Sequence, residues 1–311
     1  MEKQTKNFMV EFLGEPTAAK ASGTLYTLIA IVPVLVALVF SVLLGALGVL
    51  TKETTEQTWY LYVNVLLVQL SFALVAFAYF KWTKQPVQKT IGLEKCPWKY
   101  FLLALVLQFG LFSLSSLNDL FLQWLGVEGD MGGTEQMMQS SSLLPLLLTL
   151  ALLPALMEEV IFRGLLLRGL RVFGFVGSVL LCGGLFSLYH QNPAQTVYQF
   201  CCGAAFALLT VRSGSILPTM LAHFLNNAVI IVLYKLNVIS LPLAVLIISA
   251  VCLIGSLAYL IFIDKRVACA TDTDNKNAKE QSTERKNFWV FSAIGVILCL
   301  ISWATALFKG M

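Results

Sequence analysis

Long apolar runs alternate with short polar segments along this chain of 311 residues. Most of the runs approach the roughly 20 residues that an α-helix needs to cross the hydrocarbon core of a bilayer. The pattern therefore predicts an all-α, polytopic integral membrane bundle of eight to nine transmembrane helices. The runs lie at 24–50, 59–80, 100–125, 143–163, 175–190, 196–211, 216–234, 241–263 and 288–308.

The composition agrees with this pattern. Hydrophobic residues make up 58% of the chain and charged residues 12%, and the mean hydropathy is +0.80. These values exclude an ordinary soluble globular domain. They identify the lipid bilayer as the main surroundings of the chain.

The short segments between the runs predict the orientation. With the N-terminus in the cytoplasm, seventeen Lys and Arg residues fall on inside segments and three on outside segments, while Arg163 lies within a run. This asymmetry is typical of proteins that follow the positive-inside rule. It favours a bacterial plasma membrane, although an endoplasmic reticulum location also fits. Orientation explains the net charge of +4, and no basic patch calls for a nucleic acid.

Four regions follow from the runs. Residues 1–23 form a cytoplasmic N-terminal segment, and 24–263 form the transmembrane domain, with its chemical core at about 143–234. Residues 264–287 are polar and predict a flexible cytoplasmic loop, and 288–311 add one more C-terminal transmembrane helix. The short runs 175–190 and 196–211 predict a hairpin whose tip ends inside a protein-lined cavity.

Three ionisable residues, Glu158, Glu159 and Arg163, lie inside the apolar stretch 143–170. Each such group costs roughly 2.5–3.5 kcal/mol near the centre of a membrane helix, so it usually faces the protein interior and serves a function. Glu159 and Arg163 are four residues apart and can pair, whereas Glu158 points about 100° away around the helix. The alternative is a buried ion pair that fixes helix packing.

Both histidines of the chain, His190 and His223, fall at or within predicted spans, and Asn227 lies four residues after His223 on the same helical face. Glu158 and His190 can together hold and deprotonate a water. His223 and Asn227 can donate hydrogen bonds to the oxygen that becomes anionic when the water attacks a carbonyl. The set predicts amide hydrolysis. Hydrogen bonding between packed helices is the alternative for each residue alone.

Three motifs, E-E-x-x-x-R at Glu158, F-x-x-x-H at Phe186 and H-x-x-x-N at His223, occur in this order on separate hydrophobic segments. The set resembles the CPBP intramembrane proteases, which include the type II CAAX prenyl endopeptidases and the bacterial bacteriocin-processing or immunity proteins of the Abi group. The resemblance implies a conical intramembrane cavity and a substrate that is a membrane-embedded or lipid-modified peptide or protein. It assigns catalysis to four residues and support to three: Glu158, His190, His223 and Asn227, then Glu159, Arg163 and Phe186.

The resemblance leaves the reaction type open between a metalloprotease and a glutamate-type endopeptidase. Glu158, His190 and His223 could complete a three-ligand Zn²⁺ site with an open water position, but His223 would then leave the oxyanion role. For Glu158 and His190 to meet, the helix must extend past Arg163 to about Arg171, and the hairpin tip must stop short of the outer surface. The alternative functions are a non-proteolytic immunity or scaffold protein of the same fold, and a transporter.

Overall fold

The computed structural model describes residues 15–125, 133–238, 240–267 and 277–309, and these residues form helices and connections without any strand. Among these described residues, eight helical stretches are long and apolar enough to cross a membrane. The prediction of an all-α polytopic bundle is therefore confirmed. Two of the predicted runs, 143–163 and 175–190, lie in one stretch, Leu143–Tyr189. The chain turns within it at Gly174, whose φ of 79° favours glycine.

The stretch that carries the two adjacent glutamates alternates between two helix types. It consists of α8 (Leu143–Leu146), η1 (Leu147–Leu152), α9 (Leu153–Glu158), η2 (Glu159–Leu166), α10 (Leu167–Leu170) and η3 (Arg171–Phe173). Segments η1 and η2 are π-helical, and such turns inside α-helices are frequent at functional sites. The helix continues past Arg163 to Arg171, as predicted.

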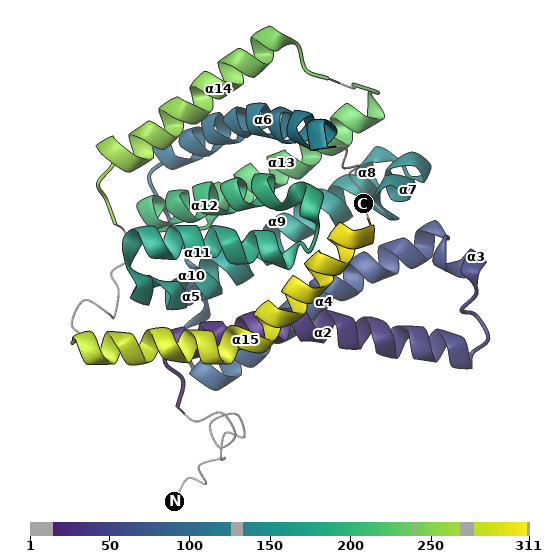
Figure 1. Cartoon of the computed structure of the whole chain (residues 1–311), viewed down its shortest axis with the longest axis horizontal. Helices are drawn as coiled ribbons and strands as arrows, with labels where there is room; N and C mark the ends of the chain where they lie inside the picture. The colour runs from purple at the N-terminus through teal and green to yellow at the C-terminus, as the bar shows by residue number, and fades with distance from the viewer. Residues whose placement is uncertain (1–14, 126–132, 239, 268–276, 310–311) are drawn as a thin grey trace, which may run out of the picture.

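A helical hairpin forms the middle of the bundle. Helix α11 (Gly174–Tyr189) packs along α12 (Thr196–Ser213), and η4 (Pro193–Gln195) lies between them. In Figure 1, α13 (Leu217–Lys235), α6 (Lys99–Leu125) and α14 (Leu243–Ala258) cover one side of this hairpin. Helices α15 (Ala278–Lys309), α2 (Ala18–Ala46) and α4 (Thr58–Thr83) cover the other side. The remaining helical segments are short: α3 (Lys52–Thr55), α5 (Val87–Ile91), α7 (Gly133–Ser140) and η5 (Tyr259–Ile263).

Glycines set the spacing of the hairpin. A Cβ on Gly203 would lie 2.8 Å from the Cα of Gly183, and one on Gly183 would lie 2.8 Å from the backbone nitrogen of Ala204. Small residues allow membrane helices to approach backbone to backbone, which maximises van der Waals contact between them. The approach places the residues that follow α11 close to the start of α12.

Helix α15 begins at Ala278, ten residues before the run at 288–308. Asn277 and Glu280 form a capping box, since the Glu280 backbone N–H donates to Asn277 Oδ1 (2.9 Å) and the Asn277 backbone N–H donates to Glu280 Oε2 (3.1 Å). The cap explains why helix formation extends into the polar segment predicted as a loop. The part of that loop at 268–276 lies outside the described residues.

Helix α15 joins two parts of the bundle. It packs against α2, where Thr27 Oγ1 donates a hydrogen bond to the Phe291 carbonyl (2.6 Å). Near its C-terminal end, Trp303 Nε1 donates to Thr196 Oγ1 (2.8 Å) at the start of α12. The contacts place the tip of the hairpin against α15.

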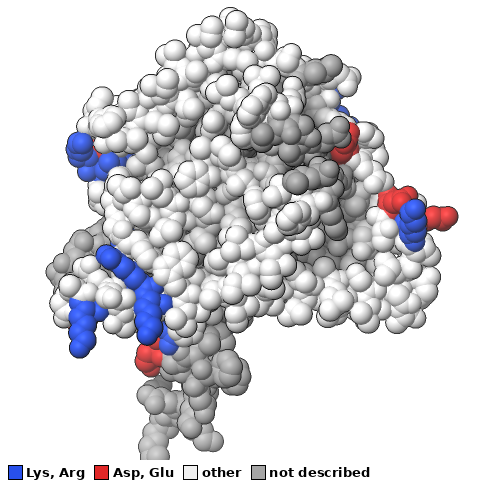
Figure 2. All heavy atoms as spheres, viewed as in Figure 1, with Lys and Arg blue, Asp and Glu red and all other residues white. Residues whose placement is uncertain are grey.

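The surface agrees with a membrane-embedded bundle. On the face drawn in Figure 2, Lys and Arg gather toward one end, and the middle is white. Large apolar side chains on α14 are exposed, including Ile247 (56%), Val251 (64%) and Ile254 (69%). Such a row is suited to lipid contact. The chain is therefore an integral multi-pass membrane protein, and its orientation stays a prediction.

Candidate active site

The pair predicted from helical spacing is present in the bundle interior. Arg163 Nη1 donates to Glu159 Oε1 at 2.8 Å, and neither side chain is exposed. His223 from α13 adds a long-range contact, with its Nδ1 2.9 Å from the same oxygen. Glu159 therefore joins η2 to α13 as well as pairing with its own helix neighbour.

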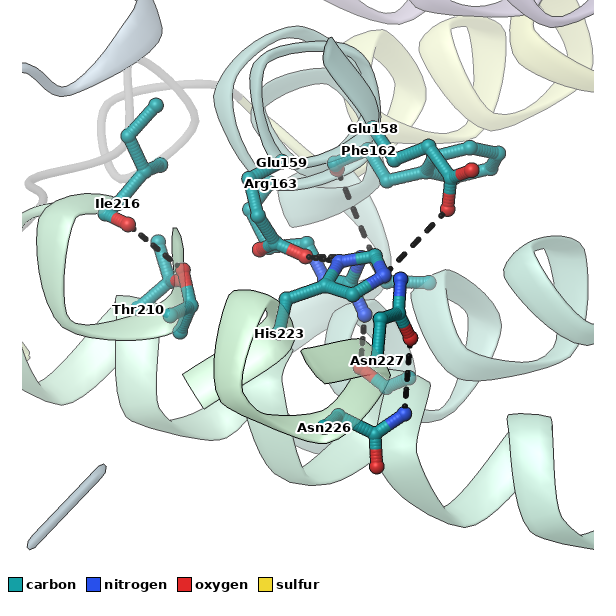
Figure 3. Close-up of polar contacts among 12 residues, drawn as sticks. Glu158, Glu159, Phe162, Arg163, Thr210, Ile216, His223, Asn226 and Asn227 are labelled. Atoms are coloured by element: carbon teal, nitrogen blue, oxygen red, sulfur yellow. Dashed lines mark hydrogen bonds and ion pairs between the residues drawn. The ribbon is translucent and has the colours of Figure 1, made fainter. Parts of the chain in front are cut away.

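Glu158 lies on the other side of the His223 ring. Figure 3 shows His223 between the two carboxylates, with Nδ1 facing Glu159 and Nε2 facing Glu158. Glu158 Oε2 is 3.8 Å from His223 Nε2 and 4.0 Å from His190 Nε2. This buried oxygen has no hydrogen-bond partner in the described part of the chain. The structure thus brings Glu158 and both imidazoles together from three helical segments.

His190 follows the last residue of α11, at the tip of the hairpin. Its Nδ1 lies 2.8 Å from the Phe186 carbonyl oxygen, one turn earlier, and its ring centroid is 4.6 Å from that of Phe186. Both contacts direct Nε2 toward Glu158. Phe186 also lies under Arg163, whose guanidinium carbon is 4.2 Å from the ring centroid, so a cation–π contact joins the two.

Asn227 lies beside His223 on α13 but bonds to other neighbours. Its Nδ2 donates to the Leu150 carbonyl (3.2 Å), and its Oδ1 accepts from Asn226 Nδ2 (3.1 Å). Neither hydrogen bond involves Glu158 or His223. The Leu150 contact connects α13 to the π-helical η1.

Two further polar residues, Gln108 and Tyr198, belong to the same interior and were not singled out from the sequence. Gln108 Nε2 (2.8 Å) and the Tyr198 hydroxyl (2.6 Å) both donate to Asn226 Oδ1. All three side chains are buried. Their signal in the sequence is faint: single polar groups within the apolar runs of α6 and α12.

A cavity of about 670 Å³ lies at the end of the bundle where α2 begins. Its lining includes Arg163 and Gly164 near the ion pair, and Lys89 and Arg168 farther out. The cavity therefore reaches Arg163, the cationic member of the ion pair. Glu158 and the two histidines are not among its lining residues.

Glu158 lies farther from the two histidines than the donor atoms of a bound zinc ion lie from one another. Zinc bound at about 2.0–2.1 Å in tetrahedral geometry places its donor atoms roughly 3.3–3.4 Å apart. The distances from Glu158 Oε2 to the two Nε2 atoms are 3.8 and 4.0 Å. Among the residues that the structure describes, no group of three His, Cys, Asp or Glu side chains is arranged to hold a metal ion.

The chain was compared with protein families, curated proteins and solved structures. Residues 140–229 match the family described as type II CAAX prenyl endopeptidase Rce1-like. Comparison with curated proteins and with solved structures gave no significant match. The matched segment covers less than a third of the chain and contains every residue of the three motifs. The resemblance inferred from those motifs is thereby confirmed, and residues 140–229 are similar to the CAAX-protease-like family.

Proposed function

We propose that this protein is an intramembrane endopeptidase in which Glu158 and His190 activate the water that attacks a peptide carbonyl. The observation that carries the proposal is the unpartnered Oε2 of Glu158, which faces two imidazole nitrogens inside an apolar bundle. A buried carboxylate oxygen without a donor is costly. A water molecule placed beside this oxygen supplies the missing hydrogen bond and is also the nucleophile.

The hydrogen bonds of His190 determine its role. A carbonyl oxygen can only accept, so the Nδ1 that faces Phe186 carries the ring proton. In the neutral ring Nε2 is then an acceptor. A water between Nε2 and Glu158 Oε2, which are 4.0 Å apart, can donate one hydrogen to each. Both groups therefore orient the water and increase its nucleophilicity.

The contacts of His223 support the opposite role, that of a hydrogen-bond donor. Glu159 is an acceptor paired with Arg163, so the Nδ1 of His223 also carries a proton. A neutral His223 would present a third acceptor to a water that has two hydrogens. For the donor role, Nε2 must also carry a hydrogen when the carbonyl is attacked. This Nε2–H can then donate to the oxygen that becomes negative during attack.

Asn227 supplies the second donor in this proposal. One amide hydrogen binds the Leu150 carbonyl, which leaves the other for the substrate oxygen. In the reaction, water oxygen bonds to the carbonyl carbon while Glu158 takes a proton. Glu158 then gives this proton to the leaving nitrogen as the C–N bond breaks. Glu159, Arg163 and Phe186 keep His223 and His190 in place.

The proposed substrate is a membrane-embedded or lipid-modified peptide or protein. The family match supports a peptide substrate, and the eight membrane-spanning stretches support one that reaches the site from the bilayer. The proposal places the N-terminus in the cytoplasm, because Lys and Arg gather at the ends of the helices on that side. Reporter enzymes fused after Lys84 and near Lys52 should report opposite sides of the membrane.

The test uses full-length protein in lipid nanodiscs and a quenched fluorogenic peptide with a hydrophobic or lipidated C-terminal segment. Glu158→Ala and His190→Ala should abolish cleavage, because general-base assistance is worth about 10²–10⁴-fold. Glu53→Gln is the matched control, since Glu53 is an exposed carboxylate on α3. Unchanged cleavage by the Glu158 and His190 variants would contradict the proposal, and a wild-type protein that does not cleave the peptide would favour a non-proteolytic scaffold or immunity protein.

A further inference from the structure

We propose that Tyr198 and Gln108 are positioning residues that, through Asn226, hold the amide nitrogen of Asn227 toward the reacting carbonyl oxygen. This inference rests on the proposed function, because it concerns the donor that stabilises the oxyanion. It assigns a role in the reaction to α6 and α12 as well as to the motif-bearing segments.

The side-chain amide of Asn226 has a fixed orientation. A carbonyl oxygen has two lone pairs, and Asn226 Oδ1 uses both: it accepts from the Tyr198 hydroxyl at 2.6 Å and from Gln108 Nε2 at 2.8 Å. A rotated Asn226 would turn its N–H groups toward Gln108 Nε2 and oppose its oxygen to Asn227 Oδ1, whose own position is fixed by the bond from Asn227 Nδ2 to the Leu150 carbonyl. The oxygen of Asn226 must therefore face α6 and α12.

The orientation of Asn226 determines that of Asn227, the next residue on α13. Because Oδ1 of Asn226 faces its two donors, Nδ2 faces Asn227 and donates to its Oδ1 at 3.1 Å. Asn227 Oδ1 is thereby an acceptor, and its nitrogen points to the other side, where one hydrogen binds the Leu150 carbonyl at 3.2 Å. A rotated Asn227 would oppose nitrogen to nitrogen and oxygen to oxygen at these two contacts.

Burial strengthens the hydrogen bonds that orient Asn227. Three residues, called the relay below, are buried: Gln108 is 3%, Tyr198 7% and Asn226 8% exposed. Solvent therefore does not readily replace a lost partner, and each contact counts for more than it would at a surface. An oxyanion donor acts in the transition state and needs a fixed direction before the reaction begins. The relay supplies that direction.

The experiment measures kcat and KM for Tyr198→Phe, Gln108→Leu, the double variant and Asn227→Ala, in full-length protein with the fluorogenic peptide. Removal of an oxyanion donor lowers kcat about 10²–10³-fold, so Asn227→Ala should show that loss with little change in KM. Each single relay variant loses one neutral hydrogen bond and should lower kcat about 3- to 10-fold. The double variant should approach Asn227→Ala.

The decisive measurement is Tyr198→Phe made on top of Asn227→Ala. If the tyrosine acts through Asn227, the added change leaves kcat within about twofold, because the group it positions is already gone. The same 3- to 10-fold drop in both backgrounds would overturn the inference. Tyr26→Phe is the matched control: Tyr26 is also a buried tyrosine, and its hydroxyl donates to the Leu185 carbonyl (3.1 Å), outside the relay.

The controls separate this inference from the proposed function. Tyr26→Phe should keep kcat near wild type, and a loss equal to that of Tyr198→Phe would also overturn the positioning role. Full cleavage by Glu158→Gln would instead contradict the proposed hydrolysis itself. Size-exclusion profiles and thermal midpoints identify any variant that fails to fold, and the relay is then tested with Gln108→Met, which removes the donor but keeps a flexible side chain of similar length.

Discussion

Two carboxylates of this protein occupy contrasting surroundings. Asp264, which follows η5 at one end of the bundle, has partners at both oxygens. Lys99 Nζ (3.2 Å) and the Tyr100 hydroxyl (2.8 Å) donate to Oδ2, and the Arg266 backbone N–H (3.1 Å) donates to Oδ1. Glu158 Oε2 has none, although it lies inside the bundle beside two imidazoles. A satisfied carboxylate stabilises the fold, whereas an unsatisfied one is available for chemistry.

Glu159, which adjoins Glu158, resembles Asp264 in being held by a cation. Its Oε1 is bonded by Arg163 and His223, its Oε2 has no hydrogen-bond partner in the described part of the chain, and none of its side chain is exposed. The two consecutive glutamates therefore differ. Glu159 connects η2 to α13, whereas Glu158 faces the two histidines.

Breaking the interior pair should cost the most stability. Arg163→Met leaves Glu159 as an uncompensated buried charge, which typically destabilises a fold by about 3–5 kcal/mol. Thermal unfolding in detergent should show a large drop in the midpoint. Adding Glu159→Gln should restore most of it, because the double variant removes both charges of the pair. Lys99→Met is the matched control, and its partly exposed pair should cost about 0–1 kcal/mol. An equal loss in both single variants would contradict the comparison.

Asp264→Asn should destabilise the protein by about 1 kcal/mol, the usual net value of a hydrogen bond, without a change in kcat. Burial acts to raise the pKa of Asp264, but hydrogen bonds from Tyr100, the Arg266 backbone and Lys99 outweigh it, so the pKa is lowered. A lowered carboxyl pKa stabilises the fold above the unfolded value, about 3.9, and this contribution disappears as the pH falls through the folded value. The midpoints of the wild type and the variant should therefore converge on acidification. A constant gap at every pH would contradict the charge-based explanation.

Glu158→Gln should leave stability unchanged or raise it by up to about 1 kcal/mol, because an amide in place of a poorly bonded carboxylate removes a desolvation cost. Activity should be lost in the same sample. Urea or thermal unfolding beside the peptide assay provides both values. A large destabilisation would place Glu158 with the structural carboxylates.

Removal of zinc should have the smallest effect, less than twofold in kcat. The two distances from Glu158 Oε2 to the imidazole nitrogens, 3.8 and 4.0 Å, are longer than the separation of donor atoms around a bound zinc ion. Elemental analysis before and after exhaustive chelation should accompany the peptide assay. Loss of activity that only added Zn²⁺ restores would show that the residues rearrange around a metal.

The sequence predicted the parts of this protein that depend on local geometry. Apolar run length located the membrane-spanning helices, and the four-residue spacing of Glu159 and Arg163 predicted their ion pair, because both features follow from the helix alone. The start of α15 was misplaced, since its polar first turns resemble a loop until the capping box is recognised.

The remaining contacts depend on how distant helices pack. The sequence does not indicate that His223 Nδ1 bonds Glu159, or that Asn226 accepts from Gln108 and Tyr198. These partners are far apart in the chain, and their meeting depends on close backbone approaches such as that of Gly183 and Gly203. Gln108 on α6 and Tyr198 on α12 can be assigned a role only when the packing of these helices is known.

The tip of the hairpin next to His190 is braced by α15, through Trp303 on Thr196 and through Gln191 Nε2 on Cys299 Sγ (3.7 Å). Helix α15 follows all the other described helices in the chain, so during synthesis it leaves the ribosome after them. The imidazole at the tip therefore gains its final support after the rest of the bundle has entered the membrane. A nascent chain that still lacks α15 is therefore expected to hold His190 less firmly than the finished chain does.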